Sequence, residues 1–390
     1  MVSLSSRDSK IDAILGYVVL RDAKLTEIMF RSLRKDPKLA SYDEWIKAGD
    51  FALEMRFFPH AFSCFQMAAE INKDENVLIR LQDTLEKITN VLEFVPIEIK
   101  ALVDEIRFNN PLDPSKWMAI VNSLLKESVN EIAFNKIEAS KLNAIKFALA
   151  FAAYVSLRSG AEIDLLNDLL KDFLLSSNQN HNPKLDLRYL SANQIKTVVL
   201  GDNISLGLEP DWSINFQSTY HYLWSKDSGL NVSLASNAIS GAGVLDLALY
   251  LGRDAIYYKP DLAIIMLGNN DAWFGKTIHL AYQALLEACI NILHEHNIKV
   301  LLVSPLPHLP EACPPDQRPT DVDLDEVEID DFVRITKLVA QNTNSTFVDL
   351  LTVFPKNKED RKKYLINGFN QPNLEGHKLI AKAIDQVVIK

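Results

Sequence analysis

The chain has 390 residues, of which 48% are hydrophobic and 24% are charged. This composition is ordinary for a globular protein and excludes a fibrous or a disordered chain. The formal net charge of -10 disfavours a broad nucleic-acid surface, which needs clustered lysine and arginine side chains. A chain of this length is most simply divided into two domains.

The segment from Met1 to Lys24 mixes charged side chains with a short apolar run from Ile14 to Leu20, and it contains no small-residue cleavage site. We therefore expect no signal peptide. The apolar stretch from Ala144 to Leu157 is interrupted by Lys146 and is shorter than the roughly 18 to 20 residues of a membrane-spanning helix. We expect this stretch to form a buried helix, and we expect no membrane association.

The three cysteines, Cys64, Cys289 and Cys313, lie far apart in the sequence. Their spacing predicts neither a disulfide framework nor a zinc site. We therefore expect a cytoplasmic protein with reduced thiols that carries no metal and no cofactor.

The first predicted domain, residues 1–180, is all-α and repeat-like. From Lys10 to about Ser177 apolar residues recur three and four positions apart, and proline and glycine are sparse. The segment from Ser41 to Asn76 resembles one tetratricopeptide repeat, with Lys73 in place of its closing proline. The residues that match the repeat are Trp45, Gly49, Ala61, Phe65 and Ala68. Later helices are expected at residues 96–106, 114–134, 139–158 and 161–174.

Two roles are open for this helical domain. Stacked helical repeats present extended surfaces that bind proteins and peptides, so the domain could dock a protein partner. Alternatively, it packs as a helical cap on the other domain.

A polar run with a proline, from Ser176 to Pro183, separates the two halves, and we place the linker at residues 181–193. Beyond it, short apolar runs alternate with stretches of helix length. The predicted strands are residues 195–200, 232–235, 262–267, 300–303 and 346–349. This alternation predicts a parallel five-stranded sheet with helices on both faces, a three-layer α/β/α domain over residues 194–390. In such sheets ligands bind at the carboxyl ends of the strands.

Three motifs follow predicted strands and a fourth ends one, and together they resemble the conserved blocks of the SGNH (GDSL-type) hydrolases. Gly201–Gly207 resembles the first block, and Asn237–Gly241 resembles the second. Leu267–Asp271 is very similar to the GxND block, and Phe347–Leu350 resembles a familiar strand ending of the family. The motifs occur in the family's order over about half of the chain. The resemblance implies an SGNH-type, flavodoxin-like sheet.

The resemblance also assigns roles to positions. Asn203 stands where the family has its catalytic serine. The backbone amide of Gly241, the side chain of Asn270 and the backbone amide of Asn203 hold the positions of the oxyanion hole. In the last block, Asn367 and Asn370 stand at the acid and histidine positions of the D-x-x-H motif.

An inserted residue would shift these last two positions to Gly368 and Gln371, and neither register supplies a carboxylate or an imidazole. His377 lies at the start of the final predicted helix, where a structural role is favoured. The resemblance gives Asp202 and Asp271 a structural role beside the oxyanion loops.

The substitutions remove the chemistry of acyl transfer. That reaction needs a hydroxyl to attack, an imidazole to accept its proton and a carboxylate to support the imidazolium, and asparagine supplies none of them. We therefore predict a catalytically degenerate hydrolase that binds a ligand, such as a glycan, or a protein partner through the remaining site, with no role in nucleic-acid binding.

Two alternatives remain. The chain could be an active esterase or acyl-transfer enzyme with a triad rebuilt from Ser205, Ser240 or His308. It could also be a structural module of a larger assembly, with the site filled by its own side chains.

Overall fold

The computed structural model describes residues 24–25, 28, 37–54, 58–89, 92, 94–107, 113–133, 137–158, 161–174, 182–186, 195–206, 232–239, 242–307, 329–366 and 371–389. The chain divides into two compact units. The first unit comprises Met1–Glu93 and Asp104–Pro111, and the second comprises Phe94–Val103 and Leu112–Lys390. The predicted linker at residues 181–193 falls within the second unit, and the predicted domain boundary stays a prediction.

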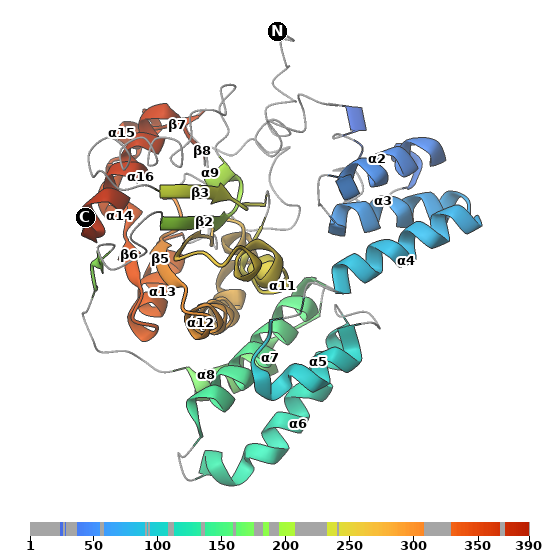
Figure 1. Cartoon of the computed structure of the whole chain (residues 1–390), viewed down its shortest axis with the longest axis horizontal. Coiled ribbons are helices and arrows are strands. Elements are labelled where there is room, and N and C mark those ends of the chain that lie inside the picture. Colours follow the sequence, from blue (N-terminus) through green and yellow to red (C-terminus); the bar gives the residue numbers. More distant parts are fainter. Residues whose placement is uncertain are drawn as a thin grey trace. The chain divides into compact units, whose positions relative to one another are not determined.

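The first unit contains the helices α2 (Tyr42–Glu54), α3 (Phe58–Ile71) and α4 (Glu75–Thr89) (Figure 1). A Cβ atom on Gly49 would lie 2.3 Å from the ring of Phe65, so only glycine allows this approach of α2 to α3. The buried core of the unit includes Trp45, Ala48, Ala61, Phe65 and Ala68. The predicted helical character is confirmed, and the tetratricopeptide resemblance stays a prediction.

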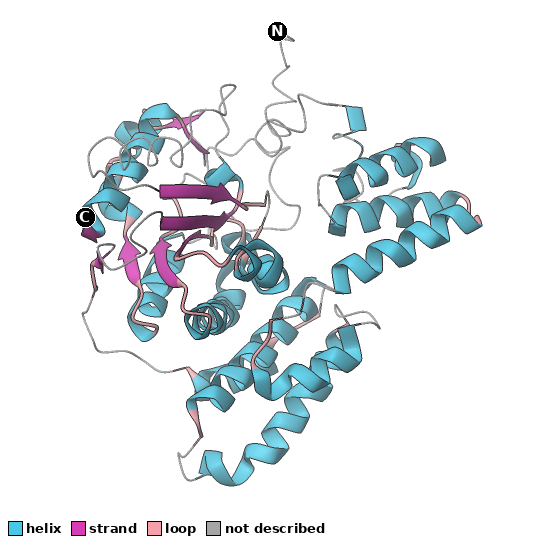
Figure 2. Cartoon of the chain, viewed as in Figure 1, coloured by secondary structure: helices cyan, strands magenta, loops and turns pink. Residues whose placement is uncertain are grey.

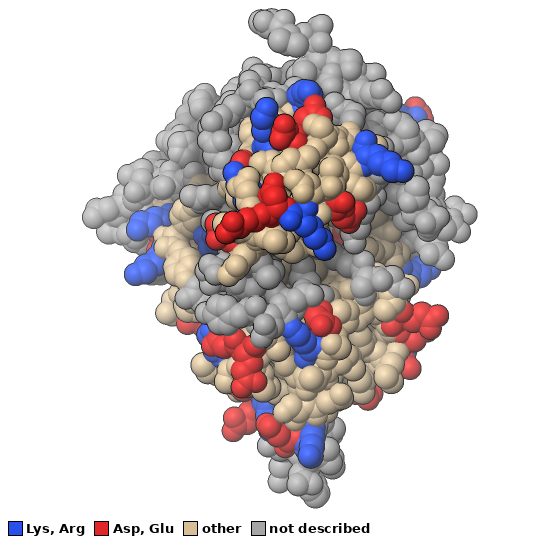
Figure 3. All heavy atoms as spheres, turned by 90° about the vertical axis from the view of Figure 1, so that its right-hand side faces the viewer, with Lys and Arg blue, Asp and Glu red and all other residues tan. Residues whose placement is uncertain are grey.

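Charged side chains of both signs are interspersed on the face drawn in Figure 3. Among the ion pairs of the first unit, Arg80 of α4 pairs with Asp50 of α2 at 2.8 Å, and Lys24 pairs with Glu44 at 2.6 Å. Positive charge therefore does not gather into one patch over the described residues of this face.

The second unit begins with helices and continues as an alternation of strands and helices. Its helices before the sheet are η3 (Ile97–Ile99), α5 (Lys100–Arg107, which crosses the unit boundary), α6 (Pro114–Ala133), α7 (Ala139–Arg158) and α8 (Asp164–Phe173). The strands are β1 (Leu185–Asp186), β2 (Ile195–Gly201), β3 (Val232–Ser236), β4 (Leu262–Met266), β5 (Lys299–Val303), β6 (Thr346–Val348), β7 (Leu365–Ile366), β8 (Gln371–Pro372) and β9 (Val388–Ile389). The helices among them are α9 (Asn203–Leu206), α11 (Val244–Asp254), η4 (Ile256–Tyr258), η5 (Asp271–Ile278), α12 (His279–Glu295), α13 (Ile329–Asn342), α14 (Leu350–Val353), α15 (Lys358–Lys362) and α16 (Leu374–Val387).

The central sheet has five parallel strands in the order β3-β2-β4-β5-β6 (Figure 2). This is the flavodoxin-like order, in which the first strand of the sheet lies between the second and the third. Val199 of β2 is in register with Ile264 of β4, which is in register with Leu301 of β5. All five strands lie where the sequence predicts them, to within one residue at either end, and the predicted fold class is confirmed.

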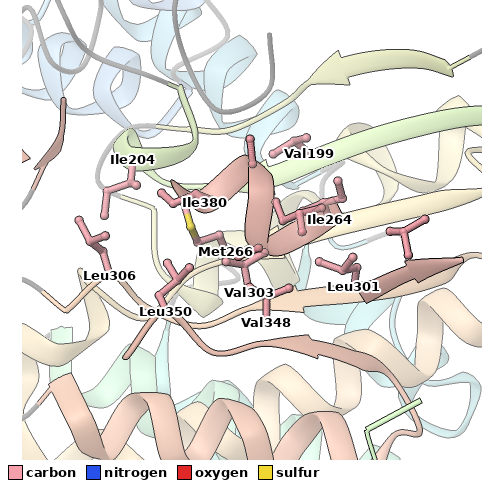
Figure 4. Packing of buried hydrophobic residues seen from close by; sticks show 14 of the residues in the cluster. Val199, Ile204, Ile264, Met266, Leu301, Val303, Leu306, Val348, Leu350 and Ile380 are labelled. Carbon is pink, nitrogen blue, oxygen red and sulfur yellow. The ribbon is translucent and has the colours of Figure 1, made fainter. Parts of the chain in front are cut away.

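Side chains alternate between the two faces of the sheet, so each strand contributes to two cores. Val199, Ile264 and Leu301 pack on one face in a cluster that includes Ile380 and Ile384 of α16 (Figure 4). The helices α11, α12 and α13 contact the sheet but contribute no residue to this cluster. They therefore cover the other face and complete the three layers.

A further helical layer lies outside α12. The helix α7 packs along α12, and its residues from Ala144 to Val155 are all buried. Two polar contacts join the helices, since Lys146 pairs with Glu287 at 2.8 Å and Asn291 donates to Asn143 at 3.0 Å. The helices α6, α7 and α8 therefore pack as a cap within the second unit, and a docking role for the helical region stays a prediction.

The helix α6 covers α7 in turn. The ring of Trp117 on α6 stacks on Phe151 of α7 with 4.1 Å between ring centroids. The predicted buried helix over Ala144–Leu157 is thus enclosed by protein, and no helix in the described ranges is both long and apolar enough to cross a membrane.

The strand β6 is an edge of the central sheet, and Asn182 closes part of it. The side-chain amide of Asn182 donates to the carbonyl of Phe347 at 3.0 Å, and its oxygen accepts from the backbone amide of Phe347 at 2.9 Å. A few residues later, β1 pairs in parallel with β9. The segment 182–186 therefore satisfies backbone groups that an open edge would leave to other chains.

Replacement of Asn182 by alanine is expected to lower the free energy of unfolding by about 1 to 2 kcal/mol, because two backbone groups of Phe347 lose their partners. Urea denaturation followed by circular dichroism measures the change. Lys184→Ala, two positions further along the same segment and exposed, serves as the control and should leave stability unchanged. Equal effects of the two substitutions would contradict this role of Asn182.

Candidate functional site

The candidate site lies at the carboxyl ends of β2, β3 and β4, where the sequence motifs follow the strands. The loop after β3 runs back along β2, because Asn237 and Ile239 donate backbone hydrogen bonds to Val199 and Gly201 at 2.9 Å each. The loop after β4 is joined to the loop after β5 by Asn269, whose side chain donates to the carbonyl of Leu306 and accepts from its amide, both at 2.9 Å. Three motif-bearing segments therefore meet at the carboxyl ends of the strands.

The turn after β2 depends on Gly201 and Asp202. A Cβ atom on Gly201 would lie 2.0 Å from the hydroxyl oxygen of Ser205 and 2.7 Å from the carbonyl oxygen of Met266. The carboxylate of Asp202 accepts from the backbone amide of Ile204 at 2.9 Å and so holds the first turn of α9. Asn203 therefore begins α9, at the position that the resemblance assigns to the nucleophile, but its side chain lies outside the described part of the structure.

Ser205, one of the residues considered as a substitute nucleophile, is fully buried. Its hydroxyl packs against Gly201 in the turn after β2. A ligand cannot reach it there without rearrangement of the turn. This position disfavours a triad rebuilt on Ser205.

The side chain of Asn270, the expected oxyanion donor, is held by two protein acceptors. Its amide nitrogen donates to the carbonyl of Ala242 at 3.0 Å and lies 3.4 Å from the Asp202 carboxylate. An asparagine amide has two hydrogens to donate, so both are directed at protein atoms. A ligand oxygen would have to replace the longer contact, the one to Asp202.

Asp271 follows directly in the chain and is fully buried. One of its carboxylate oxygens accepts from the hydroxyl of Tyr154 at 2.6 Å and from the backbone amide of Val244 at 3.1 Å. The structural role that the resemblance gives to Asp271 agrees with these contacts. The sequence offers no sign of its partner, because Tyr154 lies 117 residues earlier within an apolar helix.

The two carboxylates affect each other. Burial raises the pKa of Asp202 to about 7, the hydrogen bond from Ile204 acts against this rise, and the negative charge of Asp271 adds to it. Asp202 is almost completely buried, so it cannot touch a ligand directly. Its charge instead acts on the site through the contact with Asn270.

The last block lies between β7 and β8, which pair antiparallel. Asn367 and Asn370, and Gly368 of the shifted register, lie outside the described residues. Gln371, the shifted histidine position, pairs with Ile366 at the base of this hairpin. The helix α16 then begins after Asn373, whose side chain accepts from the amide of Gly376 at 3.1 Å.

His377 lies in the first turn of α16 and is fully buried. Burial lowers the pKa of its imidazole to about 4, so the ring is neutral near pH 7. These properties fit the structural role expected at this position.

Three further candidates, Ser240, Gly241 and His308, also lie outside the described residues. Their described neighbours Ile239, Ala242 and Pro307 lie at the same edge of the sheet. A cavity of about 20 Å³ beside Gly201, Ala242 and Leu267 has room for about one water molecule and is too small for an organic ligand.

Comparison with known proteins confirms the resemblance found in the sequence. Residues 199–379 match the sequence model of the GDSL-like Lipase/Acylhydrolase family. An acetylxylan esterase from Geobacillus stearothermophilus is 28% identical over 166 residues, which cover 40% of this chain and 71% of that protein.

Solved structures are similar to about half of the chain. One described as a GDSL-like lipase from Parabacteroides merdae is 20% identical, with a TM-score of 0.42, and the match covers 50% of this chain and 95% of that one. A variant of an acetyl xylan esterase from Geobacillus stearothermophilus is 24% identical, with a TM-score of 0.40, and the match covers 50% of this chain and 94% of that one.

Proposed function

We propose that this chain is a catalytically degenerate hydrolase of the SGNH type that binds an uncharged, oxygen-rich ligand at the carboxyl ends of its central strands. The observation that carries the proposal is that asparagine stands at the positions that the resemblance assigns to the nucleophile, the acid and the base, Asn203, Asn367 and Asn370, and that the shifted register, Gly368 and Gln371, supplies no acid or base either. An acyl-enzyme mechanism cannot run on these side chains, because none of them exchanges a proton near neutral pH.

The described part of the site supports binding more than turnover. Asn270 retains a donor that can be turned to a ligand oxygen, since its contact with Asp202 is long at 3.4 Å. Preorganised donors of this kind stabilise a carbonyl oxygen whether or not a nucleophile is present. The burial of Ser205 removes one of the groups that could have replaced the serine.

The ligand class is proposed by analogy. An acetylxylan esterase is among the relatives of this chain, so acetylated glycans are the first ligands to test. We further propose that the first unit recruits a protein partner, which its helices α2, α3 and α4 would bind.

The second candidate is an active esterase. The same relative favours it, and it would require a catalytic group built from Ser240 and His308, because Ser205 is enclosed. A measurement of ester hydrolysis distinguishes the two functions.

Hydrolysis of p-nitrophenyl acetate by the purified full chain is expected to stay at the background rate. Asn203→Ser combined with Asn370→His is expected to raise the rate at least about tenfold. The double variant restores a nucleophile and a base beside oxyanion donors that the chain retains, and such donors contribute substantially to catalysis. Asn203→Ser combined with Gln371→His tests the shifted register, and Asn203→Ser alone is the control without a base.

Saturable turnover by the unmodified chain would contradict the degenerate site and direct attention to Ser240 and His308. Binding is measured separately by calorimetry with acetylated and deacetylated xylo-oligosaccharides. Saturable binding supports the proposal, and the absence of any heat with both probes argues instead for a structural module whose site is filled by its own side chains.

A further inference from the structure

The hydroxyl of Tyr154 reaches the candidate site from outside the α/β layers. Tyr154 lies near the carboxyl end of α7, is almost completely buried, and donates a hydrogen bond of 2.6 Å to Asp271. The helix α7 belongs to the same compact unit as the sheet. A residue of the helical layer therefore contacts the motif that carries Asn270.

Two consecutive residues hold the loop that precedes α11. Asp271 accepts from the backbone amide of Val244, and Asn270 donates to the carbonyl of Ala242. A Cβ atom on Gly243 would lie 2.7 Å from the Asp271 carboxylate, so the backbone approaches this carboxylate closely. Two hydrogen bonds therefore join the segment 242–244 to the loop after β4.

These contacts hold Asn270, which supplies one of the oxyanion positions by resemblance. Gly241, which supplies another by resemblance, directly precedes the segment 242–244 in the sequence. Tyr154 directs the carboxylate of Asp271, because a hydrogen bond to a charged acceptor is short and strongly oriented. Groups that orient a ligand-binding side chain in this way control its function without touching the ligand.

The helix that delivers Tyr154 is itself held firmly. Lys146 forms a buried ion pair with Glu287 of α12, and Asn143 accepts from Asn291 of the same helix. A rigid support of this kind is what accurate positioning of a hydroxyl requires.

We propose that Tyr154 is a positioning residue of the site, through which the helical layer fixes Asp271, the start of α11 and the donor side chain of Asn270. The effect of Tyr154 on ligand binding rests on the proposed function, whereas its effect on the position of Asn270 does not. The contacts that carry it lie entirely within the described residues of the second unit.

The test compares Tyr154→Phe, which removes only the hydroxyl, with Asn143→Ala, which removes another contact between α7 and α12 away from Asp271. Both are made in the full chain labelled with ¹⁵N-asparagine, and the side-chain amide signals of Asn270 are identified by their loss in Asn270→Asp. In Tyr154→Phe these signals are expected to shift, and their hydrogen exchange to accelerate roughly tenfold or more. In Asn143→Ala they are expected to stay unchanged.

Unchanged Asn270 signals in a folded Tyr154→Phe protein would overturn the proposal, as would equal shifts in both variants. This readout needs neither ligand nor catalysis, so it separates the role of Tyr154 from the proposed function. If Asn203→Ser with Asn370→His hydrolyses p-nitrophenyl acetate, adding Tyr154→Phe is expected to lower kcat about tenfold or more with KM nearly unchanged. A merely structural loss would lower the amount of folded enzyme and leave kcat per folded molecule intact, which would also overturn the proposal.

Discussion

Replacement of Lys146 by methionine is expected to lower the free energy of unfolding by about 3 to 5 kcal/mol. The side chains of Lys146 and Glu287 are only 8% and 3% exposed, and their charged atoms lie 2.8 Å apart. Glu287 also accepts from Gln283 at 3.0 Å and from Asn342 at 2.6 Å. Without the lysine, a carboxylate would remain buried between α7 and α12 with neutral partners only. Urea denaturation of the full chain near pH 7 measures the loss.

A double variant tests the reason for this loss. Lys146→Met with Glu287→Leu is expected to recover most of the stability, because an apolar pair of similar volume can replace a buried ion pair. Lys378→Met, which removes the exposed pair of Lys378 with Glu375, should change stability by less than about 1 kcal/mol. If Lys146→Met behaved like Lys378→Met, the helical layer would not be packed on α12 as described.

Replacement of Asp202 by asparagine is expected to change how stability depends on pH. The pKa of Asp202 is raised to about 7 in the folded chain, mainly by burial, whereas an unfolded aspartate has a pKa of about 3.9. The folded state therefore binds the proton more tightly than the unfolded state between these values. The contribution of Asp202 to stability is fully present below about pH 4, falls as the pH rises through 7, and is constant above that.

Asparagine does not titrate, so the stability of the variant does not fall with rising pH for this reason. The free energy of unfolding of Asp202→Asn, taken relative to the unmodified chain, is expected to improve by roughly 4 kcal/mol between about pH 4 and pH 8. Urea denaturation at a series of pH values measures the difference. A difference that is the same at both ends of the range would show that Asp202 titrates normally and is not enclosed.

The strands were predictable because a parallel strand covered on both faces must be apolar along its length. Val198 to Leu200 and Ala263 to Met266 are such runs, and both are buried in the structure. Asp202 and Asn270 come within four residues of the ends of these runs, so the sequence predicts that both lie in loops at the carboxyl ends of the strands. Local pattern and burial agree at these positions.

The partners of these residues were not predictable. Tyr154 and Lys146 lie on one apolar helix, and their acceptors Asp271 and Glu287 come 117 and 141 residues later. Contacts over such separations depend on how helices pack, and a periodic pattern does not specify them. A clue existed in α12, whose buried residues surround the helix instead of forming one stripe, which indicates a second covering layer.

The hydrogen-bond acceptors of the Asn270 side-chain amide could not be predicted from the sequence either. The resemblance gives this side chain the role of a donor to a ligand, and the structure directs it at Ala242 and Asp202. Where a hydrogen points is decided by acceptors that the fold brings near. The motif therefore identifies the residue at this position but does not predict the direction of its side-chain amide.

The closure of the β6 edge by Asn182, together with the cover that α7 gives to α12, bears on how such a protein can be divided. A fragment beginning at residue 194 would contain every SGNH-like motif and all five strands of the central sheet. It would also present an apolar helix and an open strand to its neighbours, which favours association of the fragment with itself. The helices α6, α7 and α8 and the hydrolase-like fold lie in one compact unit, so a fragment that keeps both covers the surface of α12 that a shorter fragment would expose.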